Sequence, residues 1–244
     1  MISAVSDKAS VVDHCVGDAG QGSVPAANRA AALCRLDDFV AEAVCRYARM
    51  RNVDRGPGAP AHVSQLSPHV RHRLVLQSEL IEAALARHGF AKVEKFTQEV
   101  FWRSYWKGWL ELRPSVWTRY RQALSEQLRA VEGGGFAAAY ARACEGRTGI
   151  DCFDAWIAEL CATGYLHDHA RMWFASIWVH TLGLPWELGA DLFLHHLLHG
   201  DPASNTLSWR WVVGLQTAGN RTAGVRSCYV NRTAGLRSCY EQNS

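Results

Sequence analysis

Hydrophobic positions recur at steps of three and four along most of the chain, which is the period of an amphipathic helix. Leu36, Phe39, Val40 and Tyr47 follow this spacing, so it predicts one helix over residues 28–50. The same period predicts further helices over residues 76–87, 93–111, 115–131, 136–144, 152–162, 166–182 and 185–198, with a last helix from about 204. No long stretch alternates apolar and polar residues as a half-buried strand does. The pattern therefore predicts an all-α fold, a multi-helical bundle.

The two ends of the chain lack this period. Residues 1–27 are rich in Ser, Ala, Gly and Val, which predicts a disordered lead-in. The tail carries NRTAGVRSCYV at 220–230 and NRTAGLRSCYE at 231–241, identical at nine of eleven positions. Two copies are too few for a stacked repeat fold. We therefore expect one helical domain over 28–216 and an irregular tail over 217–244, which either has no fold or uses its basic residues for binding.

Composition limits the class of protein. The chain has 244 residues, of which 48% are hydrophobic and 20% charged, as in a packed globular protein. The net charge of +3 does not indicate nucleic-acid binding by itself but leaves room for local basic patches. Eight cysteines without a C-x-x-C pair favour reduced thiols over disulfides or zinc. The N-terminal residues hold no apolar run of signal-peptide or membrane-span length. We expect a soluble, cytoplasmic monomer.

A first candidate for chemistry is the sequence VSQLSP at 63–68. A serine followed by proline suits the start of a helix, with the hydroxyl as cap. Hydroxyls and free backbone N–H groups at a helix start also bind phosphate groups. Ser64 and Ser67 would supply both, so the segment predicts either an ordinary cap or a pyrophosphate-binding turn.

A second candidate is EVFWRSYW at 99–106. Glu99 and Arg103 are four residues apart on one predicted helix, where they could form an ion pair. Trp102, Trp106 and Trp109 share the same helical spacing. That stripe predicts either an aromatic core or a surface for a planar ligand.

A third group of motifs runs through the last third of the chain. It consists of GRTG at 146–149, Asp154, TGYLHDHARM at 163–172, Trp186 and GDPASNTLSWRW at 200–211. These motifs combine aromatic, histidine and amide side chains at fixed separations, which a plain helical bundle does not require.

Together the three groups resemble the FAD-binding, C-terminal helical domain of the photolyase/cryptochrome family. The family motifs read T-S-x-L-S-P, E-L-x-W-R-E-F-Y, G-K-T-G, T-G-W-M-H-N-R-x-R-M and D-G-D-x-A-x-N-x-x-x-W-x-W. The resemblance covers about residues 28–216. Since little sequence precedes Asn28, we expect the chain to lack the family's α/β antenna domain.

The resemblance implies FAD as cofactor and a light-driven electron transfer that repairs pyrimidine dimers in DNA, the reaction of a deoxyribodipyrimidine photolyase. The residues it implies for FAD binding are Tyr47, Ser64, Gln65, Leu66, Ser67, Arg103, Tyr165, Asp168, Arg171, Asp201 and Asn205. Those it implies for catalysis are Trp209 and Trp186 as first and second electron donors, Asn205 beside the reactive flavin nitrogen, and Glu99. Those it implies for the substrate are Glu99, Trp102, Asp168, Met172 and Trp211. Basic residues such as Arg71 and Arg73 are candidates for DNA phosphates.

The chain departs from the family pattern at several of these positions. Val63 replaces a threonine, Asp168 replaces an asparagine, and His199 stands where the family has the first aspartate of D-G-D and an Arg–Asp ion pair. The third tryptophan of the electron path is missing, with Trp109 or Trp117 as candidates to replace it.

Besides a bare helical remnant without a cofactor, three alternatives to a repair enzyme stay open. One is a cryptochrome-like blue-light sensor, and another is an inactive, truncated flavoprotein without repair activity. The third is a metal enzyme, because histidines recur at loose ligand spacing. The histidines concerned are His167, His169, His195 and His199.

Overall fold

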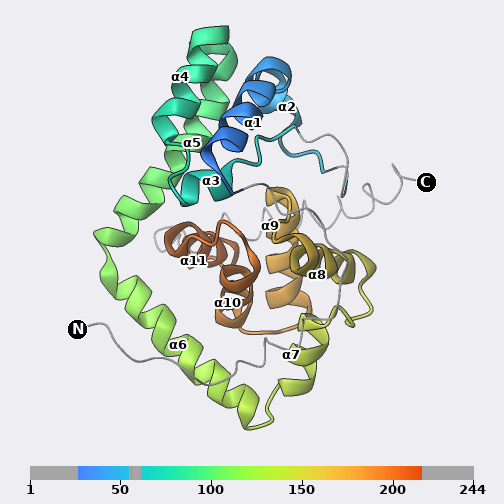
Figure 1. Cartoon of the computed structure of the whole chain (residues 1–244). Coiled ribbons are helices and arrows are strands. Elements are labelled where there is room, and N and C mark those ends of the chain that lie inside the picture. Colours follow the sequence, from blue (N-terminus) through green and yellow to red (C-terminus); the bar gives the residue numbers. More distant parts are fainter. Residues whose placement is uncertain (1–26, 55, 57–61, 216–244) are drawn as a thin grey trace.

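The computed structural model describes residues 27–54, 56 and 62–215, and every regular element among them is a helix (Figure 1). This confirms the all-α fold. The helices are α1 (Arg29–Glu42), α2 (Tyr47–Met50), α3 (Ser67–Arg71), α4 (Gln77–His88), α5 (Phe90–Glu111), α6 (Pro114–Glu132), α7 (Ala137–Cys144), α8 (Asp151–Thr163), α9 (Asp168–Ser176), α10 (Trp186–His196) and α11 (Pro202–Val212). A 3-10 turn, η2 (Val44–Arg46), precedes α2, and a π-helical turn, η3 (Ile177–Thr181), follows α9.

The helices pack into two hydrophobic clusters. The smaller cluster joins α1, α2 and α4 to the first half of α5, and the larger one joins α6 to α11. Helix α5 leaves the smaller cluster and leads into α6, which packs along α10 (Figure 1). Helix α11 packs on α5, α9 and α10, and so joins the larger cluster to the long helix α5. The lead-in and the tail expected at 1–27 and 217–244 fall almost wholly outside the described residues.

No helix among the described residues is long and apolar enough to cross a lipid bilayer.

The single helix expected over residues 28–50 is wrong. Helix α1 stops at Glu42, and the chain tightens into η2 before α2 begins at Tyr47. The break lets the Tyr47 ring meet Phe39 edge-on, with centroids 6.1 Å apart, while both rings contact Phe96 of α5. Packing against α5 overrides a periodic pattern that a straight helix would also satisfy.

The helix expected over residues 166–182 is shorter and changes type. It begins at Asp168 and widens into η3, where the Leu182 N–H donates to the Ile177 carbonyl at 2.9 Å, five residues back. A π-helical turn holds one extra residue and so rotates the side chains beyond it around the helix axis. Here Trp178 is fully buried, and its indole N–H donates to the Pro185 carbonyl at 2.9 Å.

Helices α10 and α11 approach closely at Gly189. A Cβ atom on this residue would lie 2.4 Å from Cη2 of Trp209 and 3.0 Å from Cε2 of Trp178. Real Cβ atoms do not come so near to ring carbons, and both rings are locked in the core. The absent side chain therefore sets where the Trp209 ring lies.

We predict that Gly189→Ala lowers the free energy of unfolding by about 1–3 kcal/mol, because overpacking forces the two rings to shift. Urea denaturation followed by circular dichroism measures this. Gly108→Ala is the matched control, since no atom lies within 4 Å of its Cβ position in α5. Better helix propensity should raise its stability by about 0.5–1 kcal/mol. A Gly189→Ala protein as stable as Gly108→Ala would contradict the packing described.

Candidate functional site

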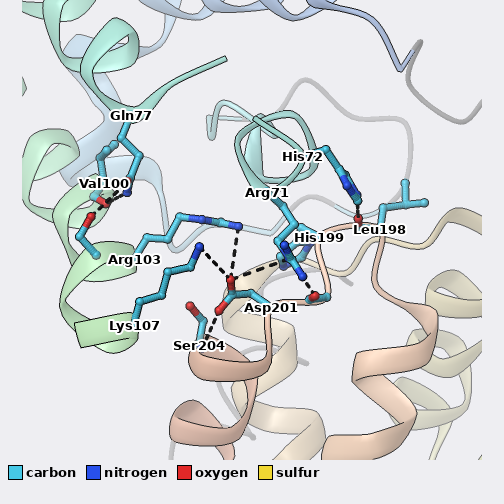
Figure 2. A network of polar contacts seen from close by, with 12 residues as sticks. Arg71, His72, Gln77, Val100, Arg103, Lys107, Leu198, His199, Asp201 and Ser204 are labelled. Atoms are coloured by element: carbon cyan, nitrogen blue, oxygen red, sulfur yellow. Dashed lines mark hydrogen bonds and ion pairs between the residues drawn. The ribbon is translucent and has the colours of Figure 1, made fainter. Parts of the chain in front are cut away.

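One buried carboxylate organises the polar residues between the two clusters. Asp201 is 4% exposed and precedes α11, where its Oδ1 atom accepts a hydrogen bond from the Ser204 N–H at 3.0 Å. Its Oδ2 atom lies 3.9 Å from Arg71 Nε, 3.8 Å from Arg103 Nη2 and 3.4 Å from Lys107 Nζ (Figure 2). These four charged residues, which we name the Asp201 cluster, connect α3, α5 and α11.

The Asp201 cluster carries more positive than negative charge. Burial raises the pKa of Asp201, but the Ser204 N–H together with Arg103 and Lys107 brings this pKa below its ordinary value. Burial lowers the pKa of Arg103. Its Nη2 atom is shielded from solvent without a hydrogen-bond partner. A buried cationic donor of this kind suits an anionic ligand such as a phosphate group.

The segment before α3 is fixed by a residue that sequence analysis missed. Arg35 of α1 donates from Nε to the Ser64 carbonyl at 3.0 Å and from Nη2 to the Gln65 side chain. Gln65 adopts a left-handed backbone, with φ of 52°. The expectation that Ser67 caps α3 is wrong, because Leu66 occupies the cap position and the Ser64 hydroxyl accepts from its N–H at 3.3 Å. No local signal could single out Arg35, since its partners lie about thirty residues away.

The loop after α10 joins the end of α3 to the end of α8. Arg71 donates from Nε to the Gly200 carbonyl at 3.1 Å, and His72 Nε2 lies 3.3 Å from the Leu198 carbonyl (Figure 2). The Leu198 N–H donates to the Gly164 carbonyl at 3.0 Å. Gly164 ends α8 in the left-handed region, and a Cβ there would lie 2.6 Å from Leu198 Cγ. The end of α3, the end of α8 and the loop after α10 thus meet in space.

Arg171 and His199 form a pair beside the Asp201 cluster. The Arg171 guanidinium donates from Nε to the Leu166 carbonyl at 2.6 Å, lies over the Tyr165 ring, and places Nη1 2.6 Å from His199 Nε2. Because a guanidinium only donates, His199 must accept through Nε2 and carry its proton on Nδ1. Burial, with the charges of Arg171 and Arg103, holds the pKa of His199 well below its ordinary value. His199 is therefore neutral.

Glu99 and Tyr47 lie where α2 packs on α5. The Glu99 carboxylate pairs with Lys95 Nζ at 3.0 Å and with Arg51 Nη1 at 3.8 Å. The ion pair considered between Glu99 and Arg103 does not form, since Arg103 faces Asp201 instead. Burial and the nearby Glu99 charge raise the pKa of the Tyr47 hydroxyl. The charge of Asp168, at the start of α9, also raises the pKa of Tyr47.

Asn205 lies one turn into α11, on its buried side. Its Nδ2 atom donates to the Ala190 carbonyl at 2.7 Å, and its backbone N–H donates to the Asp201 carbonyl at 2.9 Å. Asn205 therefore ties α11 to α10 directly after the Asp201 cluster. The contact with the Ala190 carbonyl fixes the orientation of the Asn205 amide group.

The two implied electron donors have different ring neighbours. Trp209 is 3% exposed and contacts Phe193 and Trp178, with centroids at 5.2 and 6.4 Å. Trp186 is half-buried, and its ring centroid lies 5.4 Å from that of Tyr120. The Tyr120 centroid in turn lies 5.3 Å from that of Trp117. Of the two candidates for a third tryptophan, Trp117 is thus the one connected to Trp186, through the ring of Tyr120. Trp109 lies instead beneath the Arg113 guanidinium, at 4.5 Å.

The implied substrate residues lie nearer the surface. Trp102 and Trp211 are each 44% exposed, Met172 is half-buried and Asp168 is exposed. Trp102 stacks on Trp106 at 5.4 Å rather than entering either core cluster. The aromatic-core alternative for the α5 tryptophans is therefore wrong.

The four histidines of the metal alternative do not gather. His195 Nδ1 lies 2.9 Å from the Asp191 carbonyl, and His167 Nδ1 accepts from the His169 N–H at 3.2 Å. Within residues 27–54, 56 and 62–215 no group of three or more potential ligands could hold a metal ion.

Comparisons with known proteins match most of the described chain. A family model described as the FAD binding domain of DNA photolyase matches residues 96–232, more than half of the chain. The chain is 33% identical over 198 residues to a deoxyribodipyrimidine photo-lyase of Thermus thermophilus, covering 79% of this chain and 44% of that protein. It is 32% identical over 161 residues to one of Streptomyces griseus, covering 63% and 32%. The chain thus spans less than half of these relatives.

Solved structures agree with the sequence matches. The crystal structure of a bacterial class III photolyase from Agrobacterium tumefaciens superimposes with a TM-score of 0.63 at 28% identity, covering 76% of this chain and 38% of that one. A Synechocystis cryptochrome shares the fold with a TM-score of 0.63 at 22% identity, covering 81% and 40%.

The neutral state of His199 predicts a pH-dependent stability. Because the pKa of His199 is lower in the folded protein, His199 binds a proton below about pH 6.5 in the unfolded chain but not in the folded one. The free energy of unfolding therefore falls as pH falls. The slope reaches at most about 1.4 kcal/mol per pH unit. His199→Asn should remove this component, and urea denaturation of both proteins between pH 7.5 and 5 measures it. Parallel pH profiles would contradict a neutral His199.

Proposed function

Because the chain belongs to the family of FAD-binding domains of DNA photolyases, with FAD as its cofactor, we propose that it splits cyclobutane pyrimidine dimers in DNA under blue light. The observation that carries the proposal is the Asp201 cluster, where three cations surround one carboxylate between α3, α5 and α11. The deoxyribodipyrimidine photo-lyases among its relatives support the DNA substrate.

The donors at this site fit FAD. Arg103 Nη2 and His199 Nδ1 are both shielded from solvent without a hydrogen-bond partner, and both would be satisfied by acceptor oxygens of a ligand. The segment 64–67 and Arg103 would hold the pyrophosphate, since they combine backbone N–H groups, hydroxyls and positive charge. Arg171, His199 and Asn205 would face the flavin ring.

When bound, reduced FAD supplies the electron that a dimer needs in order to split. The residues of this chain would do the remaining work of binding and orientation. The packing of Trp209 against Trp178 and Phe193 fixes one ring beside Asn205 on α11, in a dry interior. A rigid and dry surrounding holds donor and acceptor at a constant separation.

Exposed aromatic rings would receive the DNA. Trp102 and Trp211 lie on α5 and α11, which pack together, and their faces can stack on a dimer turned out of the duplex. Arg71 is held by Gly200 and Asp201, so exposed Arg73 is the better candidate for a phosphate contact. The cytoplasmic location and the monomeric state stay predictions.

A cryptochrome-like light sensor is the second candidate. The observation that favours it is Asp168, an exposed carboxylate at the start of α9 that would repel DNA phosphates near the proposed site. A sensor would bind FAD and respond to light without splitting dimers.

We predict that the protein, purified in the dark and supplied with FAD and a reductant, repairs an oligonucleotide carrying one thymine dimer under blue light. Recovery of absorbance near 260 nm measures repair. Trp102→Ala should weaken binding of the damaged oligonucleotide by about tenfold, because a lost stacking platform costs about 1–3 kcal/mol. It should leave FAD binding unchanged.

Trp109→Ala is the control on the same helix, since its ring lies beneath Arg113. It should bind the oligonucleotide as the parent protein does. If the protein binds FAD and the FAD is photoreduced, but the thymine dimers are not split, the repair proposal is contradicted and the light sensor is favoured. If the two substitutions weaken oligonucleotide binding equally, Trp102 has no specific role in the proposed DNA-binding surface.

A further inference from the structure

Arg171 is a partly buried cation without a carboxylate partner among the described residues. Its two hydrogen bonds go to the Leu166 carbonyl and to His199, and its guanidinium lies 5.7 Å from the centre of the Tyr165 ring. No ion pair between described residues includes it, although the more distant Asp168 attracts it. Burial lowers the pKa of Arg171. A cation in this position is stabilised by any anion brought within reach.

His199 is the reason why this charge is uncompensated. It meets Arg171 as a neutral acceptor, so the closest side chain contributes no negative charge. The nearby carboxylate of Asp201 is already shared by Arg71, Arg103 and Lys107. The residues described around Arg171 and the Asp201 cluster therefore hold a surplus of positive charge.

His199 also offers a donor. With Nε2 accepting from Arg171, the proton lies on Nδ1, which is shielded from solvent and has no hydrogen-bond partner. A buried donor without a partner indicates a ligand acceptor at that point. The cation and the donor together favour a ligand that is both negatively charged and rich in acceptor atoms.

We propose that the Arg171–His199 pair makes this site selective for the redox state of FAD, so that reduced FAD binds more tightly than oxidised FAD. The inference rests on the proposed FAD site. Two-electron reduction leaves the flavin ring an anion at neutral pH, whereas the oxidised ring is neutral. Only the reduced ring offers Arg171 the negative charge that the protein lacks. His199 is thus a residue that determines specificity.

The test compares the dissociation constants of the protein for FAD and for dithionite-reduced FAD, measured anaerobically in the dark at pH 7.5. Reduced FAD should bind about tenfold more tightly, as expected for one added charge beside a partly buried cation. By linkage, tenfold tighter binding raises the two-electron midpoint potential of bound FAD by about 30 mV. Spectroelectrochemical titration measures this shift independently.

Two substitutions at His199 separate charge from shape. His199→Asp gives Arg171 a carboxylate partner, so the ratio of the two dissociation constants should fall to about threefold or less. His199→Asn stays neutral and can still accept from Arg171, so it should keep the parent ratio. Arg171→Gln removes the cation and should lower the ratio as His199→Asp does, which decides the question if His199→Asp does not fold.

The outcomes keep this inference apart from the proposed function. Equal affinity of the parent protein for both redox states, or an unchanged ratio in the variants that alter charge, overturns the selectivity while FAD binding stands. Failure of the parent protein to bind FAD in either state contradicts the proposed function and this inference with it.

Discussion

The site depends on one buried carboxylate that faces more positive charge than it can neutralise. Asp201 caps α11 through one oxygen and faces Arg71, Arg103 and Lys107 through the other. The same carboxylate group therefore fixes the start of α11 and the position of three side chains from α3 and α5. A buried acid in this role costs desolvation energy that only several close cations and N–H donors can offset. The resulting surplus of positive charge prepares the site for an anion.

The hydrophobic clusters hold this polar arrangement in place. Helix α11 joins the larger cluster to α5, and close contact at Gly189 and the π-helical turn η3 position Trp209 and Trp178 next to the polar residues. The polar residues thus lie on rigid helices, where a shift of one side chain requires a shift of packed rings. The proposed electron transfer to a flavin would need this constancy, because its rate depends on a fixed separation of donor and acceptor.

Helical periodicity predicted most of the fold. The helices from α4 to α8 begin and end close to their expected bounds because each buries an apolar stripe, which in α5 runs along the first half only. The prediction failed at Ala43 and at Ile177, where the chain bends or widens to place a ring against another helix. Such changes depend on partners far along the chain, so a local pattern does not contain them.

The site was predictable where its residues stand in motifs and not where they stand alone. The separations of Ser64, Arg171 and Asp201 carry the resemblance to a known family, and the structure brings their segments together. Arg35 and Lys107 were missed, since a basic residue on a polar helix face has no signal that reveals a partner about thirty or ninety residues away. The sequence alone does not indicate that His199 is neutral, because this conclusion depends on its contact with Arg171.

The most direct test of this account is the stability of Asp201→Asn. Asparagine keeps the helix cap but removes the charge, so the three cations lose their common partner. Urea denaturation should show a loss of about 1–3 kcal/mol in the free energy of unfolding. Glu99→Gln, which breaks a more exposed ion pair, should cost about 0–1 kcal/mol. An Asp201→Asn protein as stable as the parent would contradict the central place given to this carboxylate.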